Sequence, residues 1–269
     1  MAIVMLFPMA VDEPQKCCDG YRLSHLILPF QRFLKQGRTL WCIAIRFTGI
    51  KCAKVTTILA ERVILDAQVH LRINRRIQRR IKEAELKVLA HPGEIDYSID
   101  RGVAKSQVAE VLSLGFIRRH HNLLVTGPTG CGKTYLVCAI AHSAIVADHT
   151  VRYFRLSHLL ELIAIARADG TYKSFLTKLR TKDVVIIDDF GLAPIASRGS
   201  RELLDILDER IGVATTIIAS QLPVSTWYQS FEDQTVADAI LDRLLHDSLR
   251  LEMKGESMRK LLAHRDEST

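Results

Sequence analysis

One eight-residue stretch near the middle of the chain, GPTGCGKT, constrains the fold more than any other feature of the sequence. The apolar run NLLVT precedes it and the apolar run YLVCAIA follows it, so it predicts a turn between a strand and a helix. The stretch matches the pattern GxxxxGK[ST] in full. Glycines let backbone N–H groups close around phosphate oxygens, and the N-terminal end of the next helix adds positive potential. We therefore expect a phosphate-binding loop.

Side chains and backbone of this loop have separate expected roles. Lys133 is expected to reach the β- and γ-phosphates of ATP, and Thr134 to supply a hydroxyl to Mg²⁺. The surrounding backbone is expected to contact the nucleotide through Gly127, Pro128, Thr129, Gly130, Cys131, Gly132 and Tyr135. We interpret Cys131 as a neutral spacer, with redox regulation as the alternative. The expected cofactors are ATP and Mg²⁺.

Two acids directly follow four apolar β-branched residues in the stretch VVIIDDFG. A strand of this kind places them at the carboxyl edge, where open α/β sheets bind ligands. Asp188 is the expected partner of Thr134 at Mg²⁺, and Asp189 is expected to orient and polarise a water that attacks the γ-phosphate. Alternatively, Asp189 only caps the next helix, since Asp is a favourable N-cap.

The strand-like run TTIIAS leads into Gln221. If this strand lies between the two motif strands, Gln221 lies beside the γ-phosphate and senses it through a hydrogen bond. The alternative is that Ser220 and Gln221 are ordinary loop residues before Pro223.

Strand-like and helix-like segments alternate from residue 101 onward, which predicts an α/β domain over 101–269 with a parallel sheet and helices on both faces. Upstream, the stretch from Ile58 to Leu89 contains no Gly or Pro and predicts one long helix or a pair. Its apolar stripe has a spacing of four residues: Leu65, Val69, Ile73, Ile77 and Ile81. Residues 58–100 are thus a predicted basic helical region and linker.

Residues 1–57 show no sustained helical or strand periodicity and stay unassigned. We expect them to be dispensable or harmful, the product of a misassigned start or a frameshift. Six cysteines without paired spacing favour a reducing, cytoplasmic environment. The apolar opening MAIVMLFPMA is too short to span a bilayer, and LWCIAIRFTGI is interrupted by Arg46, so we expect no membrane segment.

The 37 Lys and Arg residues exceed the 30 Asp and Glu residues, for a formal net charge of +7. This balance favours a polyanionic partner. Expected contacts with double-stranded DNA, through phosphates rather than base edges, are Arg72, Arg75, Arg76, Arg79, Arg80 and Lys82 on the long helix, with Lys173, Lys178 and Arg180. The alternative is a solvated basic face.

From about Asn74 to Lys260 the chain resembles the IstB-like ATP-binding proteins, helpers of insertion-sequence transposition related to DnaC-like helicase loaders and AAA+ initiators. The resemblance is carried by HHNLLVTGPTGCGKTYL, VRYFRLSHLLELIAIARADG, VVIIDDFGLAPI, IIASQLPVSTWY, ADAILDRLLHD and LEMKGESMRK. It implies an AAA+ core behind a small helical N-terminal domain, assembly on DNA as a homo-oligomer, DNA-dependent ATP hydrolysis, and recruitment and stimulation of a transposase.

The resemblance also assigns roles to single residues. The loop residues match Walker A, the acid pair matches Walker B, and Gln221 matches the first sensor. Arg243 matches the arginine finger, which acts on a neighbouring subunit's nucleotide, and Arg259 is a weaker match to a second sensor. No arginine lies beside the motifs in the sequence, which is a further reason to expect a finger from a neighbour. The alternative for Arg243 is a surface salt bridge with Asp242 or Asp247.

Three other functions compete with a transposition helper. A replicative helicase loader differs chiefly in its partner. A phosphoryl-transfer kinase needs an acceptor pocket and an arginine-bearing lid, for which the sequence offers no candidate. A degenerate copy that folds poorly is the third.

Overall fold

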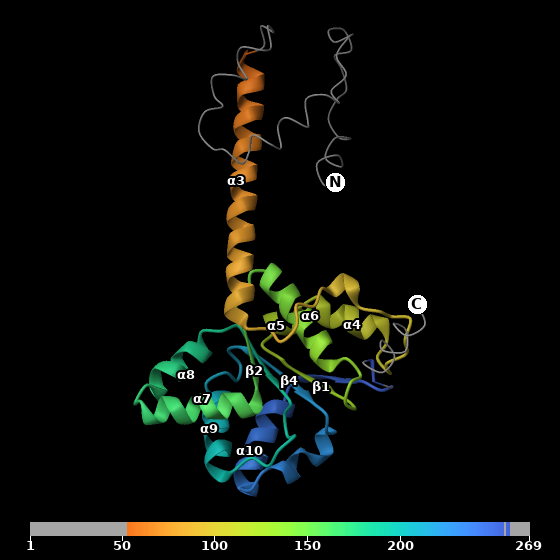
Figure 1. The fold of residues 1–269 in the computed structure, drawn as a ribbon, viewed down its shortest axis with the longest axis vertical. Helices are drawn as coiled ribbons and strands as arrows, with labels where there is room; N and C mark the ends of the chain where they lie inside the picture. The colour runs from red at the N-terminus through yellow and green to blue at the C-terminus, as the bar shows by residue number, and fades with distance from the viewer. Residues whose placement is uncertain (1–52, 256, 259–269) are drawn as a thin grey trace, which may run out of the picture. The chain divides into compact units, whose positions relative to one another are not determined.

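The computed structural model describes residues 53–255 and 257–258 (Figure 1). The chain divides into two compact units between Leu65 and Asp66. Most of the unassigned segment 1–57 lies outside the described residues. Of the expected helical N-terminal region the structure describes one helix, α3, Ala53–Ala84.

Helix α3 is continuous, so of the two alternatives the single helix is correct. It ends at Ala84, earlier than the predicted Leu89, because Glu85 adopts a left-handed φ of 51° that breaks the helical geometry. No helix in the described part of the chain combines the length and the apolar character that a membrane span needs.

Five strands form one sheet with the order β2-β3-β4-β1-β5, and every pairing is parallel. They are β1 Asn122–Thr126, β2 Val151–Arg155, β3 Val184–Asp188, β4 Thr215–Ser220 and β5 Ser248–Glu252. The predicted parallel sheet is confirmed. The edge strand β5, SLRLE, was not predicted from the sequence, because only Leu249 and Leu251 of its five residues are apolar.

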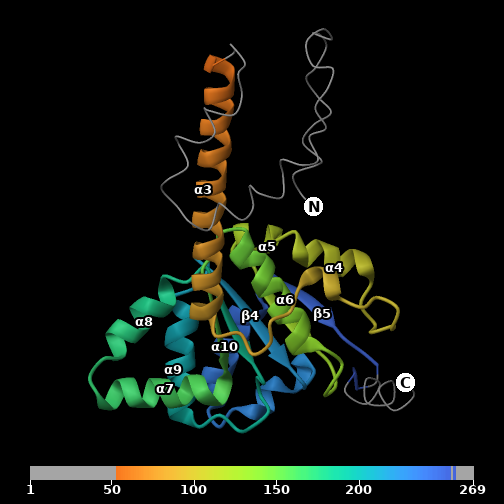
Figure 2. The same cartoon turned by 45° about the horizontal axis from the view of Figure 1, so that its top comes forward.

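Helices cover both faces of the sheet, as Figures 1 and 2 show. On one face lie α4 Lys105–Leu112, α5 Gly115–Arg118 and α6 Lys133–Val146; on the other lie α7 Leu156–Ala168, α9 Ser197–Asp208 and α10 Gln234–Leu245, with α8 Tyr172–Arg180 beside α7 and α9. Two short 3-10 helices complete the described part, η3 Pro92–Glu94 and η4 Val224–Ser230.

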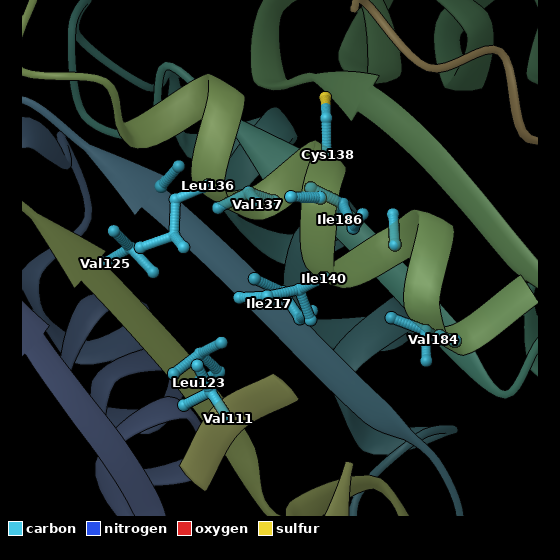
Figure 3. Packing of buried hydrophobic residues seen from close by; sticks show 14 of the residues in the cluster. Val111, Leu123, Val125, Leu136, Val137, Cys138, Ile140, Val184, Ile186 and Ile217 are labelled. Carbon is cyan, nitrogen blue, oxygen red and sulfur yellow. The ribbon is translucent and has the colours of Figure 1, made fainter. Parts of the chain in front are cut away.

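The core forms two layers because successive strand residues face opposite sides of the sheet. Leu123 and Val125 of β1 pack toward α6, whereas Leu124 between them packs toward α7, α9 and α10. Figure 3 shows the first layer, where residues of α6 such as Ile140 lie over Ile186 and Ile217 of the central strands. Burial on both faces explains why the central strands read as continuous apolar runs.

Candidate nucleotide-binding site

The strand order brings the three sequence motifs together at the carboxyl ends of the central strands. Strand β4 lies between β1 and β3, as the sensing role of Gln221 requires. The amide of Gly127 donates to the carbonyl of Ser220 at 3.2 Å. The Thr129 hydroxyl donates to Oε1 of Gln221 at 2.5 Å, so Gln221 lies directly beside the loop.

Two loop glycines allow a close approach of other chain segments. Gly127 has φ +149°, and a Cβ there would collide with the carbonyl of Met253. Gly132 has φ +100°, and a Cβ there would lie 3.2 Å from Nη1 of Arg101. The positive φ strains any other residue at both positions, and at Gly127 the Met253 backbone also blocks a side chain.

The Lys133 ammonium is buried, with 6% of the residue exposed, and donates to the carbonyls of Gly127 at 2.7 Å and Pro128 at 2.8 Å. It has no carboxylate partner among the residues that the structure describes. A buried cation without a counter-ion is costly. A phosphate group supplies the negative charge that the loop itself lacks, so the loop fits a nucleotide polyphosphate.

The Asp188 carboxylate collects donors from three elements. Its Oδ2 accepts from Thr134 Oγ1 at 2.8 Å and from the Tyr153 hydroxyl at 2.7 Å, and the ammonium of Lys87 lies 3.9 Å away. Burial, followed by the hydrogen bond to Asp188, raises the pKa of Tyr153 well above its usual value. The phenol therefore stays protonated at neutral pH and keeps donating to the carboxylate.

A hydroxyl and a carboxylate in contact form an oxygen donor set suited to Mg²⁺. Over residues 53–255 and 257–258, no group of three or more His, Cys, Asp or Glu residues could hold a metal. Mg²⁺ commonly takes one or two protein ligands together with phosphate oxygens and water, so Thr134 and Asp188 fit this ion rather than an all-protein cage.

Asp189 has a left-handed backbone, with φ +58°, which places it in a tight turn after β3. Its amide donates to Oδ1 of Asp188 at 2.9 Å, and Nε of Arg155 lies 3.9 Å from its Oδ2. The next α-helix, α9, has Ala196 as its N-cap residue. The alternative that Asp189 caps that helix is therefore wrong.

Four residues near the loop and the acid pair escaped the sequence analysis: Lys87, Arg101, Tyr153 and Arg155. The expectation that no arginine lies beside the motifs is wrong in space. Arg155 ends β2 in register with Asp188, so its place at the end of a strand is a signal that the sequence offered. Lys87 and Arg101 lie in the irregular segment between α3 and α4, where no periodicity or motif marks them.

A cavity of about 340 Å³ adjoins the loop. Its walls come from residues 95–101, Val103, Lys105 and Val108, from Tyr135 and Leu136 of α6, and from Met253 after β5. Tyr135 donates to Oε2 of Glu94 at 3.4 Å, and burial, then the nearby Glu94 charge, raises its pKa. The cavity offers both apolar surface and hydrogen-bonding groups beside the loop, as small-molecule sites do.

Arg243 lies near the amino end of β1, opposite the end that the phosphate-binding loop follows. Its guanidinium pairs with Asp208 of α9 and donates to the Ala239 carbonyl at 2.8 Å. Its own carbonyl accepts from Asn122, the first residue of β1, at 3.0 Å. The alternative of a salt bridge with Asp242 or Asp247 is therefore wrong, because the partner is Asp208. The finger role stays a prediction.

Arg259 lies outside the described residues. One residue before it, the Met258 amide donates to the carbonyl of Gly130 at 3.0 Å.

The expected DNA-contacting residues differ in their availability. Arg76 and Arg80 both pair with Oδ1 of Asp148, at 3.2 and 2.6 Å. Arg79 pairs with Glu83 at 3.3 Å, and Arg180 with Glu209 at 3.5 Å. The remainder are exposed and form no ion pair with any described residue: Arg72, Arg75, Lys82, Lys173 and Lys178. DNA contact stays a prediction, and these five side chains are the ones free to make it.

Known proteins share this fold. The chain has a TM-score of 0.52 and 20% identity to the crystal structure of DnaI, over 61% of this chain and 90% of that one. It has a TM-score of 0.53 and 18% identity to AMPPCP-bound DnaA from Aquifex aeolicus, over 68% of this chain and 56% of that one. At these identities the likeness establishes the fold alone, and the expected P-loop AAA+ fold is correct.

Sequence relatives are more specific. An insertion-sequence ATP-binding protein (by its name) of Sinorhizobium fredii is 38% identical over 198 residues, 74% of this chain and 81% of that protein. One named for insertion sequence IS21 of Pseudomonas aeruginosa is 32% identical over 188 residues, 70% of this chain and 71% of that protein. The family described as IstB-like ATP binding protein matches residues 53–267. The chain therefore belongs to the IstB-like ATP-binding proteins.

Proposed function

We propose that this protein is a cytoplasmic, Mg²⁺-dependent ATPase that assembles on double-stranded DNA and recruits or stimulates the transposase of an insertion sequence. The observation that carries the ATPase is the convergence of Lys133, Asp188, Asp189 and Gln221 at one edge of the sheet. The relatives named for insertion sequences support the biological setting.

Each group at this edge has one task in the proposed reaction. Lys133 binds the β- and γ-phosphates, and Thr134 with Asp188 would hold Mg²⁺, which supplies charge neutralisation when bound. Asp189 orients a water and accepts its proton as the water attacks the γ-phosphate. Gln221 uses Oε1 to accept from Thr129, so its amide NH₂ is free to donate to the γ-phosphate.

The cavity beside the loop favours a nucleotide, with a base and sugar to fill it, over inorganic polyphosphate as the ligand of this site. Arg101 lines this cavity and lies beside Gly132, so the cavity is next to the phosphate-binding loop. Tyr97 and Tyr135 also line it and offer aromatic surface to a base. ATP is the nucleotide that the family description names.

The experiment is phosphate release from ATP by the full chain, with and without Mg²⁺ and duplex DNA, against Lys133→Ala. We expect Mg²⁺-dependent turnover that rises with DNA, and a nucleotide affinity about 10- to 100-fold weaker in the variant because a buried charged contact is lost. Equal affinity and equal turnover in the two proteins would overturn the site.

The partner requires a separate measurement. Purified transposase encoded by the same insertion sequence and purified replicative helicase should be tested for binding to the ATP-bound protein on duplex DNA. We expect the transposase to bind. Binding of the helicase alone would replace the transposition role with helicase loading.

A further inference from the structure

Arg101 lies outside every sequence motif, yet its side chain lies beside Gly132 of the phosphate-binding loop. Its Nη1 is 3.2 Å from the position that a Cβ on Gly132 would occupy, and Gly132 directly precedes Lys133 at the start of α6. The side chain also lines the cavity together with Tyr97 and Tyr135. A guanidinium therefore lies between the loop and the cavity.

This guanidinium has no partner within the described part of the chain. Its Nε is buried and donates to no hydrogen-bond acceptor there, and Arg101 forms no ion pair with a described residue. A buried donor without an acceptor is destabilising, and more so when the group is charged. The planar guanidinium fork matches phosphate oxygens, which can accept two of its N–H groups at once.

The backbone of Arg101 is held independently of its side chain. The Lys254 amide donates to the Arg101 carbonyl at 2.6 Å. The Gly102 amide donates to Oδ1 of Asp100 at 2.9 Å, in a turn where Gly102 has φ +68°. The fold thus fixes where the side chain starts, while no described residue forms a hydrogen bond or an ion pair with its guanidinium.

We propose that Arg101 binds, within its own chain, a phosphate that ATP and ADP have in common. The inference rests on the proposed function. Thr129 contacts Gln221, the residue expected to sense the γ-phosphate. Arg101 instead lies beside Gly132, at the opposite end of the loop, and lines the cavity. Arg101 therefore adds affinity for both nucleotides and does not read the γ-phosphate.

The test compares Arg101→Gln and Arg101→Met with wild type in the full chain, measuring affinities for ADP and ATP by titration calorimetry in Mg²⁺. We expect both affinities to fall by about 10- to 100-fold, and by the same factor, because one charge-assisted contact is lost from a shared phosphate. The matched control is Arg118→Gln on α5, which removes the same charge from an exposed position and should leave both affinities unchanged.

Thermal unfolding of the nucleotide-free proteins separates this role from a structural one. Because the guanidinium has no partner among the described residues, Arg101→Met should unfold at the same temperature as wild type or higher. A lower unfolding temperature with unchanged ADP affinity would overturn the inference, and so would a loss confined to ATP. If wild type itself binds neither nucleotide, the proposed function fails as well.

Discussion

Asp189 has two properties that a single substitution can separate. Its carboxylate is the proposed base, and its backbone has φ +58°, a conformation that Asn tolerates about as well as Asp. Asp189→Asn should therefore keep the fold and the affinity for ATP, while turnover falls about 100-fold or more because the amide is a far poorer base. Nucleotide titration and steady-state phosphate release measure the two properties. Normal turnover in this variant would remove Asp189 from the reaction.

Tyr153 holds the proposed Mg²⁺ ligand in place through its hydrogen bond to Oδ2 of Asp188. Tyr153→Phe keeps the ring in the core but removes that donor. Replacing a residue that orients a metal ligand commonly weakens metal affinity by about 10-fold or more. The Mg²⁺ concentration for half-maximal turnover should therefore rise by about that factor.

Tyr172 supplies the control for this measurement, since its hydroxyl donates to Asp205 at 2.9 Å, at a residue that belongs to neither motif. Tyr172→Phe should leave the Mg²⁺ requirement unchanged. Equal Mg²⁺ curves for Tyr153→Phe and wild type would show that Asp188 needs no support from β2.

Single residues differ in how far the sequence could predict them. The loop and the acid pair are predictable because contiguous residues perform the chemistry in each. Arg101, Lys87 and Tyr153 take part through packing between distant segments, and no local pattern records that contact. Arg210 is the same case in the core. It is 1% exposed, and burial lowers its pKa to about 10, whereas from the sequence alone an arginine is expected at the surface. Its guanidinium donates to the carbonyls of Leu179, Lys182 and Thr215.

Elements were predictable where both faces are buried. The strands β1, β3 and β4 read as apolar runs, and the helices between them have the expected period. The edge strand β5 alternates Leu249 and Leu251 with polar or charged residues over only five positions, which is too short to distinguish from a loop. The end of α3 was misplaced because the left-handed Glu85 has no sequence signal, unlike the Pro-Gly pair at Pro92.

Helix α3 carries two kinds of arginine, which predict different effects. Arg72 and Arg75 are exposed and unpaired among described residues, whereas Arg76 and Arg80 pair with Asp148. If α3 contacts DNA phosphates, replacing Arg72 and Arg75 by Gln should lower the slope of log affinity against log salt by about 2, since each phosphate contact contributes about 0.9. Binding to duplex DNA between low and moderate salt measures this.

The matched double variant replaces Arg76 and Arg80 by Gln. Because these side chains are engaged with Asp148, it should change the slope by less than the first variant does. An unchanged slope for the Arg72 and Arg75 variant would identify α3 as a solvated basic face rather than a DNA contact.

The whole molecule has its proposed arginine finger far from its own nucleotide site. Arg243 adjoins the amino end of β1 through Asn122, whereas the phosphate-binding loop follows the carboxyl end of the same strand. Within one chain Arg243 therefore cannot act on the nucleotide that its own loop binds. A finger role requires a second copy, and turnover should then rise more steeply than linearly with protein concentration.

Arg243→Ala should reduce turnover about 10³-fold while each subunit still binds ATP, because the finger acts on charge in the transition state. The ion pair with Asp208 provides the control. Asp208→Asn removes the pair but leaves the arginine, so it should remain active if Arg243 is a finger. If the ion pair itself were what matters, both variants would lose the same activity.

Mixing two inactive proteins tests whether the site is shared between subunits. Arg243→Ala keeps an intact loop, and Lys133→Ala keeps an intact finger, so mixed assemblies contain some sites with both halves. We expect a mixture of the two to recover part of the wild-type turnover, whereas a mixture of Arg243→Ala with Arg243→Ala/Lys133→Ala recovers none. No recovery in the first mixture, together with turnover linear in concentration, would mean that each chain completes its own site. Arg155, whose Nε lies 3.9 Å from Oδ2 of Asp189, would then be the candidate to neutralise charge on the γ-phosphate.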